Sequence, residues 1–287
     1  MRMITWNIQW GRGADGRVDL ARTIATLRGM GEADVICLQE VARDVDGLAG
    51  GDTGDQVVAL TEAFPGFEAV FAPGVDVPGR DGRRAQFGNL VLSRLPVDQA
   101  CRHVLPFPPD PQLPGMRRAC AEVVVLAPSG PLRVMCTHLE YYSAIQRRAQ
   151  IEALRGLQDE CAAAVTVGMA AGKADSSPVF AVRPRPVSVI VCGDFNCEPD
   201  SVDHELMARP YIHHRHGWCD AWHVAHPGVP HAPTVGVHEA EWPDRPYCCD
   251  YFWVSEDLLG SVRRVEVNAE TDASDHQPVV LELEMPT

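Results

Sequence analysis

The sequence predicts an α/β sandwich that folds as one domain over residues 1–287. Three observations support this prediction: strand-like apolar runs recur along the chain, helical segments are inserted between them, and no break in composition or internal repeat marks a domain boundary. The chain is 46% hydrophobic and 22% charged, which is ordinary for a globular protein and excludes wholesale disorder. A core of substantial size is therefore expected.

The N-terminal part is predicted as strand, helix, strand, helix. Ile4 and Trp6 alternate with the polar Thr5 and Asn7, and apolar residues recur at helical spacing over 20–27 after a glycine-rich turn. The apolar run at 34–39 is bounded by polar residues, which is typical of a buried strand. A second helix is expected at 55–64, where a Pro-Gly pair ends it.

The remaining elements continue this alternation. The longest helix is expected at 143–165, with Ile145 and Leu154 on its apolar stripe and Arg155 off it. A short helix is expected at 202–207. The expected strands are, in chain order, 68–71, 88–93, 119–126, 132–138, 187–192, 251–254, 262–267 and 278–283.

Long loops are expected where proline, glycine and polar residues gather. Three of them, at 73–85, 106–116 and 204–245, are long enough to wall a pocket. A linker is expected at 168–186. Its segment 168–173 only superficially resembles a phosphate-binding loop, because the two glycines are one residue too close and no Ser or Thr follows the lysine.

Composition also limits the partners and the location. Lys and Arg number 25 against 39 Asp and Glu, a formal net charge of −14, which disfavours nucleic-acid binding driven by phosphate neutralisation. The ten cysteines form no C-x-x-C pair and are expected to be small buried residues. No apolar run is long enough for a membrane span. The N-terminus lacks the apolar segment of a secretory signal, so a cytoplasmic location is expected.

Polar residues with catalytic chemistry stand at the ends of the predicted strands. Loops at strand ends are where rigid scaffolds display such groups, although a single Asn or His there is usually a cap or a turn. Together they supply the carboxylate, amide and imidazole groups suited to a hard divalent cation and a phosphate. These residues are Asn7, Glu40, His138, Asp194, Asn196, Asp250, Asp275 and His276.

The motifs around them resemble the ordered motif series of the endonuclease/exonuclease/phosphatase superfamily, the deoxyribonuclease I-like fold. From residue 5 to residue 280 the matches are Thr-Trp-Asn7, Leu-Gln-Glu40, Thr-His138-Leu-Glu, Gly-Asp194-Phe-Asn196, Asp250-Tyr-Phe-Trp-Val-Ser and Ser-Asp275-His276-Gln-Pro-Val. The resemblance implies a four-layer α-β-β-α sandwich, with two sheets face to face and helices outside. It also implies a metal-dependent hydrolase of phosphate esters.

The resemblance further implies a metal site. Asn7, Glu40 and Asp275 would offer oxygen ligands to Mg²⁺, which takes few protein ligands and keeps several waters. Mn²⁺ is an alternative ion. The metal would neutralise charge that builds up in the transition state.

The other five residues are assigned to catalysis by the same resemblance. Asp194 would orient or deprotonate the attacking water, and Asn196 would hold a phosphoryl oxygen or the nucleophile. Asp250 would hydrogen-bond His276 and favour the imidazolium that meets a phosphate oxygen. His138 would donate a hydrogen bond or a proton towards the phosphate or the leaving group.

Several residues have simpler explanations. Asn7 could merely cap a loop, and Asp250 could be an edge-strand charge. Tyr141 and Tyr142 could touch substrate, but packing at the start of a helix is the favoured interpretation. Arg117 and Arg118 could contact a phosphate, with a solvated strand start favoured instead. The histidines at 213–216 fit no common zinc spacing, so a solvated loop is expected there.

Three functions stay open: two classes of enzyme and a binding protein without catalysis. The favoured hypothesis is a phosphodiesterase or phosphatase for a small or lipid-like phosphate ester, which needs only a compact pocket. The alternative is a nuclease acting on DNA or RNA. A catalytically silent binding module is less favoured, because all the core motif residues are present. A nuclease would need an extended basic groove, and the chain offers only scattered arginines: Arg80, Arg83, Arg84, Arg117, Arg118, Arg147 and Arg148.

Overall fold

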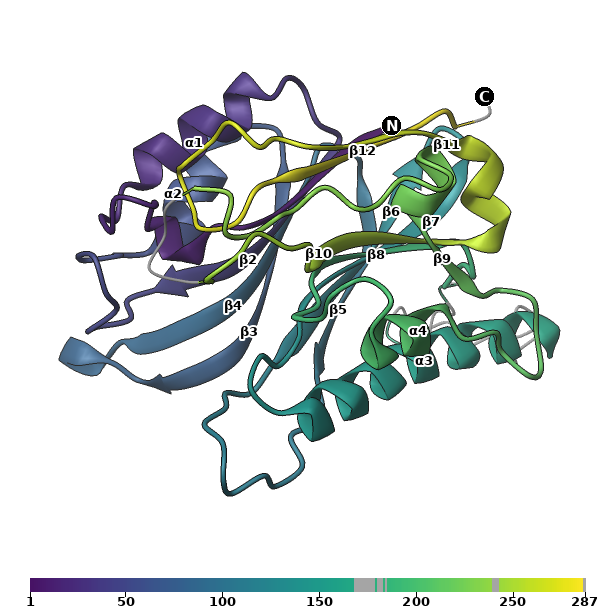
Figure 1. Ribbon diagram of the computed structural model, residues 1–287, viewed down its shortest axis with the longest axis horizontal. Helices are drawn as coiled ribbons and strands as arrows, with labels where there is room; N and C mark the ends of the chain where they lie inside the picture. Colours follow the sequence, from purple (N-terminus) through teal and green to yellow (C-terminus); the bar gives the residue numbers. More distant parts are fainter. Residues whose placement is uncertain (168–178, 180–182, 184, 239–242, 286–287) are drawn as a thin grey trace.

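A computed structural model describes residues 1–167, 179, 183, 185–238 and 243–285. In these residues two six-stranded sheets lie face to face, and helices cover the outer side of each (Figure 1). The four-layer α-β-β-α sandwich of the deoxyribonuclease I-like fold is thus confirmed. The segment at 168–173, which superficially resembles a phosphate-binding loop, lies outside the described residues.

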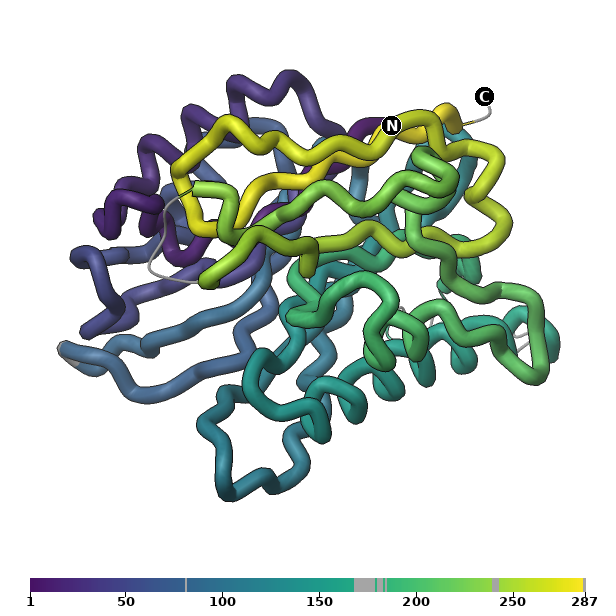
Figure 2. The backbone as a smooth tube through the Cα atoms, in the orientation of Figure 1, coloured from purple at the N-terminus to yellow at the C-terminus, as the bar shows by residue number. Residues whose placement is uncertain are grey.

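Each sheet is mixed. The first consists, in order across the sheet, of β11 (Val262–Val267), β12 (Val279–Leu283), β1 (Arg2–Asn7), β2 (Val35–Arg43), β4 (Arg84–Ser93) and β3 (Glu68–Pro78). The second consists of β5 (Val97–Val104), β6 (Ala119–Ala127), β7 (Gly130–His138), β8 (Val189–Asp194), β10 (Asp250–Ser255) and β9 (Trp218–Asp220). Because β1 pairs with β12, the two ends of the chain lie close together (Figure 2).

Five α-helices accompany the sheets among the described residues. They are α1 (Leu20–Gly29), α2 (Gln56–Ala63), α3 (Ala144–Thr166), α4 (Val202–Ala208) and α5 (Ala221–Ala225). Three short 3-10 helices are η1 (Gln9–Gly11), η2 (Arg80–Gly82) and η5 (Glu256–Ser261). Within the described ranges, no helix combines the length and the apolar character needed to cross a membrane.

Three apolar layers hold the sheets and helices together. Met3 on β1 packs between the two sheets, whereas its neighbour Ile4 packs against α1 and α2. On β7, Val134 faces the other sheet, whereas Met135 packs against α3 and α4. Successive residues of a strand point to opposite faces, so strands buried on both faces are continuous apolar runs. This is why the sequence marks most of them clearly.

Three strand predictions are wrong, all at sheet edges. β5 is not expected from the sequence because its residues are half-exposed and polar, as suits the edge of the second sheet. β3 continues to Pro78 and pairs with β4 from Arg84, so the loop expected at 73–85 is a hairpin. Proline is tolerated there because β3 is the edge strand of the first sheet. The loop expected at 204–245 likewise contains β9, the edge strand of the second sheet, and α5. The helix expected at 202–207 is confirmed as α4.

The buried face of α3 is more polar than its apolar spacing predicts. Ile145 is 60% exposed and Arg155 only 4%, the reverse of the prediction. Arg155 Nη1 donates to the Met207 carbonyl, 3.0 Å, and its guanidinium covers the Tyr211 ring. Through Arg155, α3 holds the backbone at the end of α4. Arg155 is buried because it makes these contacts.

Glu122 on β6 is a buried carboxylate held by three basic side chains. It is 1% exposed, and its oxygens lie 3.2 Å from Arg133 Nε, 2.9 Å from Arg185 Nη2 and 3.0 Å from His103 Nε2. Burial disfavours the carboxylate, but hydrogen bonds from His103 and Arg185 outweigh it and lower the pKa of Glu122 from 4.5 to about 2. Ionised Glu122 therefore stabilises the folded chain.

Glu122→Gln is expected to lower the free energy of unfolding by about 3 kcal/mol at neutral pH. The lowered pKa means that this contribution is complete above pH 4.5 and is lost as the pH falls towards 2. Denaturant unfolding of wild type and variant should therefore show a difference that shrinks on acidification. The exposed Glu68→Gln is the control. A difference that does not change with pH would contradict this role of the Glu122 charge.

Candidate active site

The second sheet brings polar strand ends to one place. His138 and Asp194 are the last residues of the parallel strands β7 and β8 and stand opposite each other. Asp250 is the first residue of β10, which runs antiparallel to β8, and it also stands opposite Asp194. Asn7 ends β1 in the facing sheet. The carboxyl ends of parallel strands and the amino ends of antiparallel neighbours meet at one edge, and the site forms there.

Gly193 allows the close approach of β7 and β8 beside the site. Its φ of 136° lies in the region that favours glycine, and a Cβ at this position would lie 1.8 Å from the Thr137 carbonyl oxygen. A side chain here would push His138 and Asp194 apart. The glycine of the Gly-Asp194-Phe-Asn196 motif is therefore a packing requirement of the site.

A β-bulge turns Glu40 towards the site. The register of β2 against β4 shifts between Leu38 and Val41, and Glu40 has a left-handed φ of 58°. Such a conformation costs a non-glycine residue about 1–3 kcal/mol and persists only where the surrounding structure enforces it. As a result, Glu40 Oε1 accepts a hydrogen bond from Asn7 Nδ2, 3.3 Å. Asn196 has a similar backbone conformation, with φ 49°.

The Asp194 carboxylate is the centre of the site. Its Oδ2 accepts a hydrogen bond from Asn7 Nδ2, 3.0 Å, and its Oδ1 accepts one from the Asn196 backbone N–H, 2.9 Å. Two imidazoles flank it: His138 Nε2 lies 3.4 Å and His276 Nε2 lies 3.7 Å from Oδ2. One buried carboxylate thus collects amide and imidazole groups from both sheets.

Asp275 completes the acidic side of the site. Its Oδ2 accepts a hydrogen bond from Gln9 Nε2, 2.6 Å, and its Oδ1 accepts one from Ser274 Oγ, 3.2 Å. It lies near enough to Glu40 to repel that carboxylate. The structure therefore gathers every residue named from the sequence, namely Asn7, Glu40, His138, Asp194, Asn196, Asp250, Asp275 and His276.

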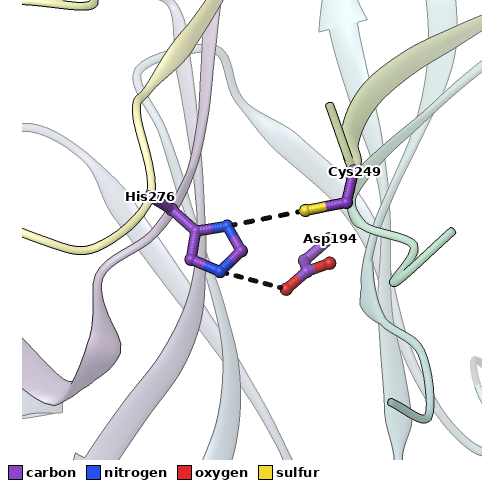
Figure 3. Close-up of side chains that lie close together, drawn as sticks. All are labelled: Asp194, Cys249 and His276. Carbon is purple, nitrogen blue, oxygen red and sulfur yellow. Dashed lines mark hydrogen bonds and ion pairs between the residues drawn. The ribbon is translucent and has the colours of Figure 1, made fainter. Parts of the chain in front are cut away.

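Asp250 and His276 form a buried hydrogen-bonded pair. His276 Nδ1 lies 2.9 Å from Asp250 Oδ2, and the side chains are 8% and 1% exposed. Cys249 lies on the same side of the ring, with Sγ 3.9 Å from His276 Nδ1, whereas Nε2 faces Asp194 (Figure 3). Burial raises the pKa of Cys249 well above 9.0, so the thiol keeps its proton and donates to Asp250 Oδ2, 3.5 Å.

The two histidines of the site differ in charge. Burial disfavours the imidazolium of His276, but the carboxylates of Asp250 and Asp194 outweigh it and raise the pKa of His276 well above 6.5. Burial and repulsion from Arg118 lower the pKa of His138 well below 6.5. At neutral pH the site presents one imidazolium and one neutral imidazole. His138 is therefore suited to hydrogen bonding and not to proton donation.

Asn196 sets the orientation of the neutral His138 ring. Its Nδ2 donates to the Leu139 carbonyl, 3.0 Å, and lies 3.0 Å from His138 Nε2. An amide nitrogen is a donor, so we assign the proton of the neutral ring to Nδ1. That nitrogen lies 3.7 Å from Glu40 Oε1.

Three residues offer oxygen ligands to a divalent cation. Burial and repulsion from Asp275 raise the pKa of Glu40 to about 7, and burial raises the pKa of Asp275. Within the part of the chain that is described, Glu40 Oε2 is buried without a hydrogen-bond partner. Asn7 Oδ1 accepts from the Gln9 N–H, 3.1 Å, and keeps a second lone pair. A hard cation would relieve the repulsion and use the open oxygen, so these residues fit Mg²⁺ or a similar ion.

Comparison with known proteins agrees with this geometry. The sequence profile of the Endonuclease/Exonuclease/phosphatase family matches residues 4–276. The chain belongs to this family. A search of curated proteins found no match.

Solved structures share the fold of this family member. An endonuclease/exonuclease/phosphatase from Beutenbergia cavernae is 25% identical, with a TM-score of 0.69 over 99% of this chain and 71% of that chain. A mannosyl-6-phosphatase from Bacteroides thetaiotaomicron is 15% identical, with a TM-score of 0.64 over 99% of both chains. A Neisseria 3′ phosphatase bound to a product DNA hairpin is 18% identical, with a TM-score of 0.60 over 99% of both chains.

One interpretation of residues beside the family's histidine motif is wrong. Tyr141 and Tyr142 lie just before α3 and pack edge to face on each other, with 36% and 55% of their surface exposed. Arg118 is buried instead of solvated, and its Nε donates to Glu140 Oε2, 3.3 Å. Substrate contact by the tyrosines stays open, whereas Arg118 orders the chain just after His138.

The histidines at 213–216 are exposed only in part. His213 is exposed, whereas the His214 side chain is 10% exposed and its Nε2 lies 2.9 Å from Asp159 Oδ1. The His216 backbone N–H donates to His214 Nδ1, 3.1 Å, so both ring nitrogens of His214 have protein partners. The solvated loop expected here is thus confirmed for His213 and wrong for His214.

Thr234 is a site residue that the sequence does not reveal. Its Oγ1 donates to Asp250 Oδ2, 2.6 Å, and accepts from the backbone N–H groups of Cys249 and Asp250, 3.0 and 3.1 Å away. The residue lies in the 204–238 segment, which has little periodicity and so gives no signal. Its hydroxyl fixes the Asp250 carboxylate behind His276.

Thr234→Val is expected to lower kcat/KM for a phosphate ester by roughly 10- to 100-fold, because it removes a hydrogen bond to a buried carboxylate. Thr234→Ser keeps the hydroxyl and should stay close to wild type. Steady-state kinetics on both variants, with melting curves to verify folding, tests this. Equal activities of the Val and Ser variants would exclude the hydroxyl from the site.

Proposed function

We propose that this family member is a metal-dependent hydrolase of phosphate esters, in which water attacks phosphorus. The arrangement around Asp194 carries the proposal: two amides and two imidazoles of different charge surround one buried carboxylate. Glu40 and Asp275 add a second acidic group beside it. Solved relatives named as a mannosyl-6-phosphatase and a 3′ phosphatase support the reaction class.

Asn7, Glu40 and Asp275 would hold the divalent cation. Their oxygens favour Mg²⁺, with Mn²⁺ as the alternative. When bound, the ion would polarise the phosphate and neutralise charge that develops on its oxygens. The mutual repulsion of Glu40 and Asp275 supports this assignment.

The remaining residues handle water and protons. Asp194 would accept the proton of the attacking water, since the N–H groups of Asn7 and Asn196 hold its carboxylate in one orientation. The Asn196 amide oxygen would help to hold that water. His276, charged and oriented by Asp250, would donate from Nε2 to a phosphoryl oxygen as it gains charge.

A small or lipid-like phosphate ester is the substrate class that we propose. Electrostatic binding of a nucleic acid needs unneutralised Lys and Arg, and this chain carries a net charge of −14. Of the seven arginines that could line a groove, six pair with carboxylates, namely Arg80, Arg83, Arg84, Arg118, Arg147 and Arg148. The seventh, Arg117, lies over the Phe107 ring.

A nuclease or nucleic-acid phosphatase is the second candidate. The Neisseria 3′ phosphatase of the same fold is seen with a DNA hairpin, so this fold accommodates nucleic acid in at least one relative. A binding module without catalysis is disfavoured, because the acidic, amide and imidazole groups are all present and in contact.

The test is hydrolysis of nitrophenyl phosphate mono- and diesters with Mg²⁺, with Mn²⁺ and with a chelator. Wild type should turn over in a metal-dependent way, and Asp194→Asn should be inactive. Asp19→Asn is the matched control, because Asp19 caps α1 and asparagine caps a helix equally well. A panel of sugar phosphates, inositol phosphates, nucleotide diesters, sphingomyelin, plasmid and abasic oligonucleotide then separates the two candidates. Activity that is independent of metal or of Asp194 would overturn the proposal.

A further inference from the structure

A second cluster of side chains that could bind a metal lies outside the active site. It lies on residues 204–238, which hold eight of the eleven histidines. His204 Nε2 and His231 Nε2 lie 2.9 and 2.7 Å from the same carboxylate oxygen, Asp220 Oδ2. The three atoms all lie within 4.8 Å of one another, and the side chains are 6%, 4% and 3% exposed. They come from α4, from the end of β9 and from the loop after α5, so only the folded chain brings them together.

The carboxylate of this cluster is held in place by the backbone. Asp220 caps α5, and its Oδ1 accepts the Trp222 N–H, 2.8 Å, which leaves Oδ2 to the two imidazoles. The cluster therefore places one carboxylate oxygen and two imidazole nitrogens together. Two histidines and a carboxylate are a known ligand set for zinc, with the fourth position taken by another ligand.

One residue of the cluster, His231, also lines a groove with a volume of about 460 Å³, and His223 lines the same groove. The His223 ring lies 4.7 Å from the His231 ring and 6.0 Å from the His204 ring, measured between centroids. A water from the groove, or His223 itself, can therefore supply a fourth ligand.

We propose that His204, Asp220 and His231 bind a Zn²⁺ ion at a site separate from the active centre. Imidazole suits Zn²⁺, whereas the oxygen ligands of the active site suit Mg²⁺, so the two sites select different ions. With metal bonds of about 2.0–2.1 Å, a tetrahedral ion needs ligand atoms roughly 3.4 Å apart. Ion binding would therefore open the present contacts by about half an ångström, which small rotations of the two rings allow.

The ion would fasten the loop that leads to Thr234. His231 lies three residues before Thr234, whose hydroxyl holds Asp250. A metal link from His231 to α4 and β9 restrains this loop from two sides. The ion would therefore stabilise this loop: its loss lowers the melting temperature and loosens the support of Asp250, without removing a group that touches substrate.

The test is the zinc content and zinc-dependent stability of the full chain. Wild type is stripped with a chelator, reloaded with Zn²⁺ in excess Mg²⁺ and dialysed against Mg²⁺ alone. It should retain about one Zn²⁺ per chain by mass spectrometry of the metal and melt at a higher temperature than the stripped protein. Co²⁺ in place of Zn²⁺ should give the visible absorption of a tetrahedral site.

His204→Gln and His231→Gln decide between a metal site and a plain hydrogen-bond network. Glutamine still donates a hydrogen bond to Asp220 but is a poor zinc ligand, so both variants should fold yet lose the retained zinc and the zinc-dependent rise in melting temperature. His213→Ala, which removes an exposed imidazole outside the cluster, should keep both. Zinc retention unchanged in both glutamine variants, loss of zinc in His213→Ala, or no zinc retained by wild type would each overturn the proposal.

Discussion

Replacing Asp250 with asparagine should lower kcat/KM by about 10³- to 10⁴-fold while leaving the fold intact. The buried carboxylate lies 2.9 Å from His276 Nδ1, and together with Asp194 it raises the pKa of that imidazole. An amide oxygen can still accept from Nδ1–H, but it brings no charge to hold the second proton. The ring is then neutral, with a bare Nε2 towards the substrate, and it cannot donate to a phosphoryl oxygen.

His276→Ala should be as harmful as Asp250→Asn, and the double variant should be little worse than either. Groups that act as one unit do not lose their effects additively. Asp34→Asn is the matched control, because Asp34 pairs with Arg94 away from the site. Steady-state kinetics on the four proteins, with melting curves for each, gives the cycle. Additive losses would mean that the two residues act independently, and the pair would have to be abandoned.

The residues at strand ends are predictable from the sequence for a physical reason. A strand buried on both faces is a continuous apolar run, so a polar residue that ends the run has to leave the core. Asn7, Asp194 and Asp250 are found in this way. Their convergence needs more: it depends on which strands are neighbours and in which direction they run. The local pattern of apolar and polar residues does not say which strands are neighbours. Only the resemblance to the ordered motif series of the family implied it.

The features that the sequence does not show depend on backbone conformation or on distant partners. The bulge that turns Glu40 inwards is a left-handed residue within a strand, and nothing in Leu-Gln-Glu40 marks it. Arg155 can be buried because it hydrogen-bonds the Met207 carbonyl and packs on the Tyr211 ring, both of which are distant in sequence. Thr234 and His231 act through partners far away in sequence, in a segment without periodicity.

The cluster of His204, Asp220 and His231 also could not be found from the sequence. The histidines at 213–216 are close in sequence and attract a zinc interpretation, yet His213 is exposed and both ring nitrogens of His214 have protein partners. His204, Asp220 and His231 are far apart in sequence, so no spacing rule finds them. Ligand spacing identifies sites built on one short element, whereas this cluster is assembled from three.

Glu40→Gln should have opposite effects on the metal-free and the metal-loaded protein. Without metal, burial and repulsion from Asp275 raise the pKa of Glu40 from 4.5 to about 7. Protonated Glu40 is tolerated in the folded protein, so wild type keeps its full stability below pH 4.5 and loses part of it as the pH rises through 7. Glutamine cannot ionise, so the variant should be more stable than wild type at pH 8 by about 2–3 kcal/mol. At pH 4 the two should be nearly equal.

With metal, the same variant should be the weaker protein. A neutral amide is a poorer ligand for a hard dication than a carboxylate, and loss of even an outer partner costs 10- to 100-fold in metal affinity, so the Mg²⁺ concentration for half-maximal rate should rise by about 100-fold or more. Melting curves in chelator and a Mg²⁺ titration of the rate measure the two effects, with the exposed Glu62→Gln as control. An unchanged titration would remove Glu40 from the ligands. The change in melting temperature in chelator separates the remaining explanations. If Glu40 served only packing, its replacement would lower the stability of the protein. If Glu40 is a carboxylate that binds a cation, its replacement raises the stability of the protein in chelator.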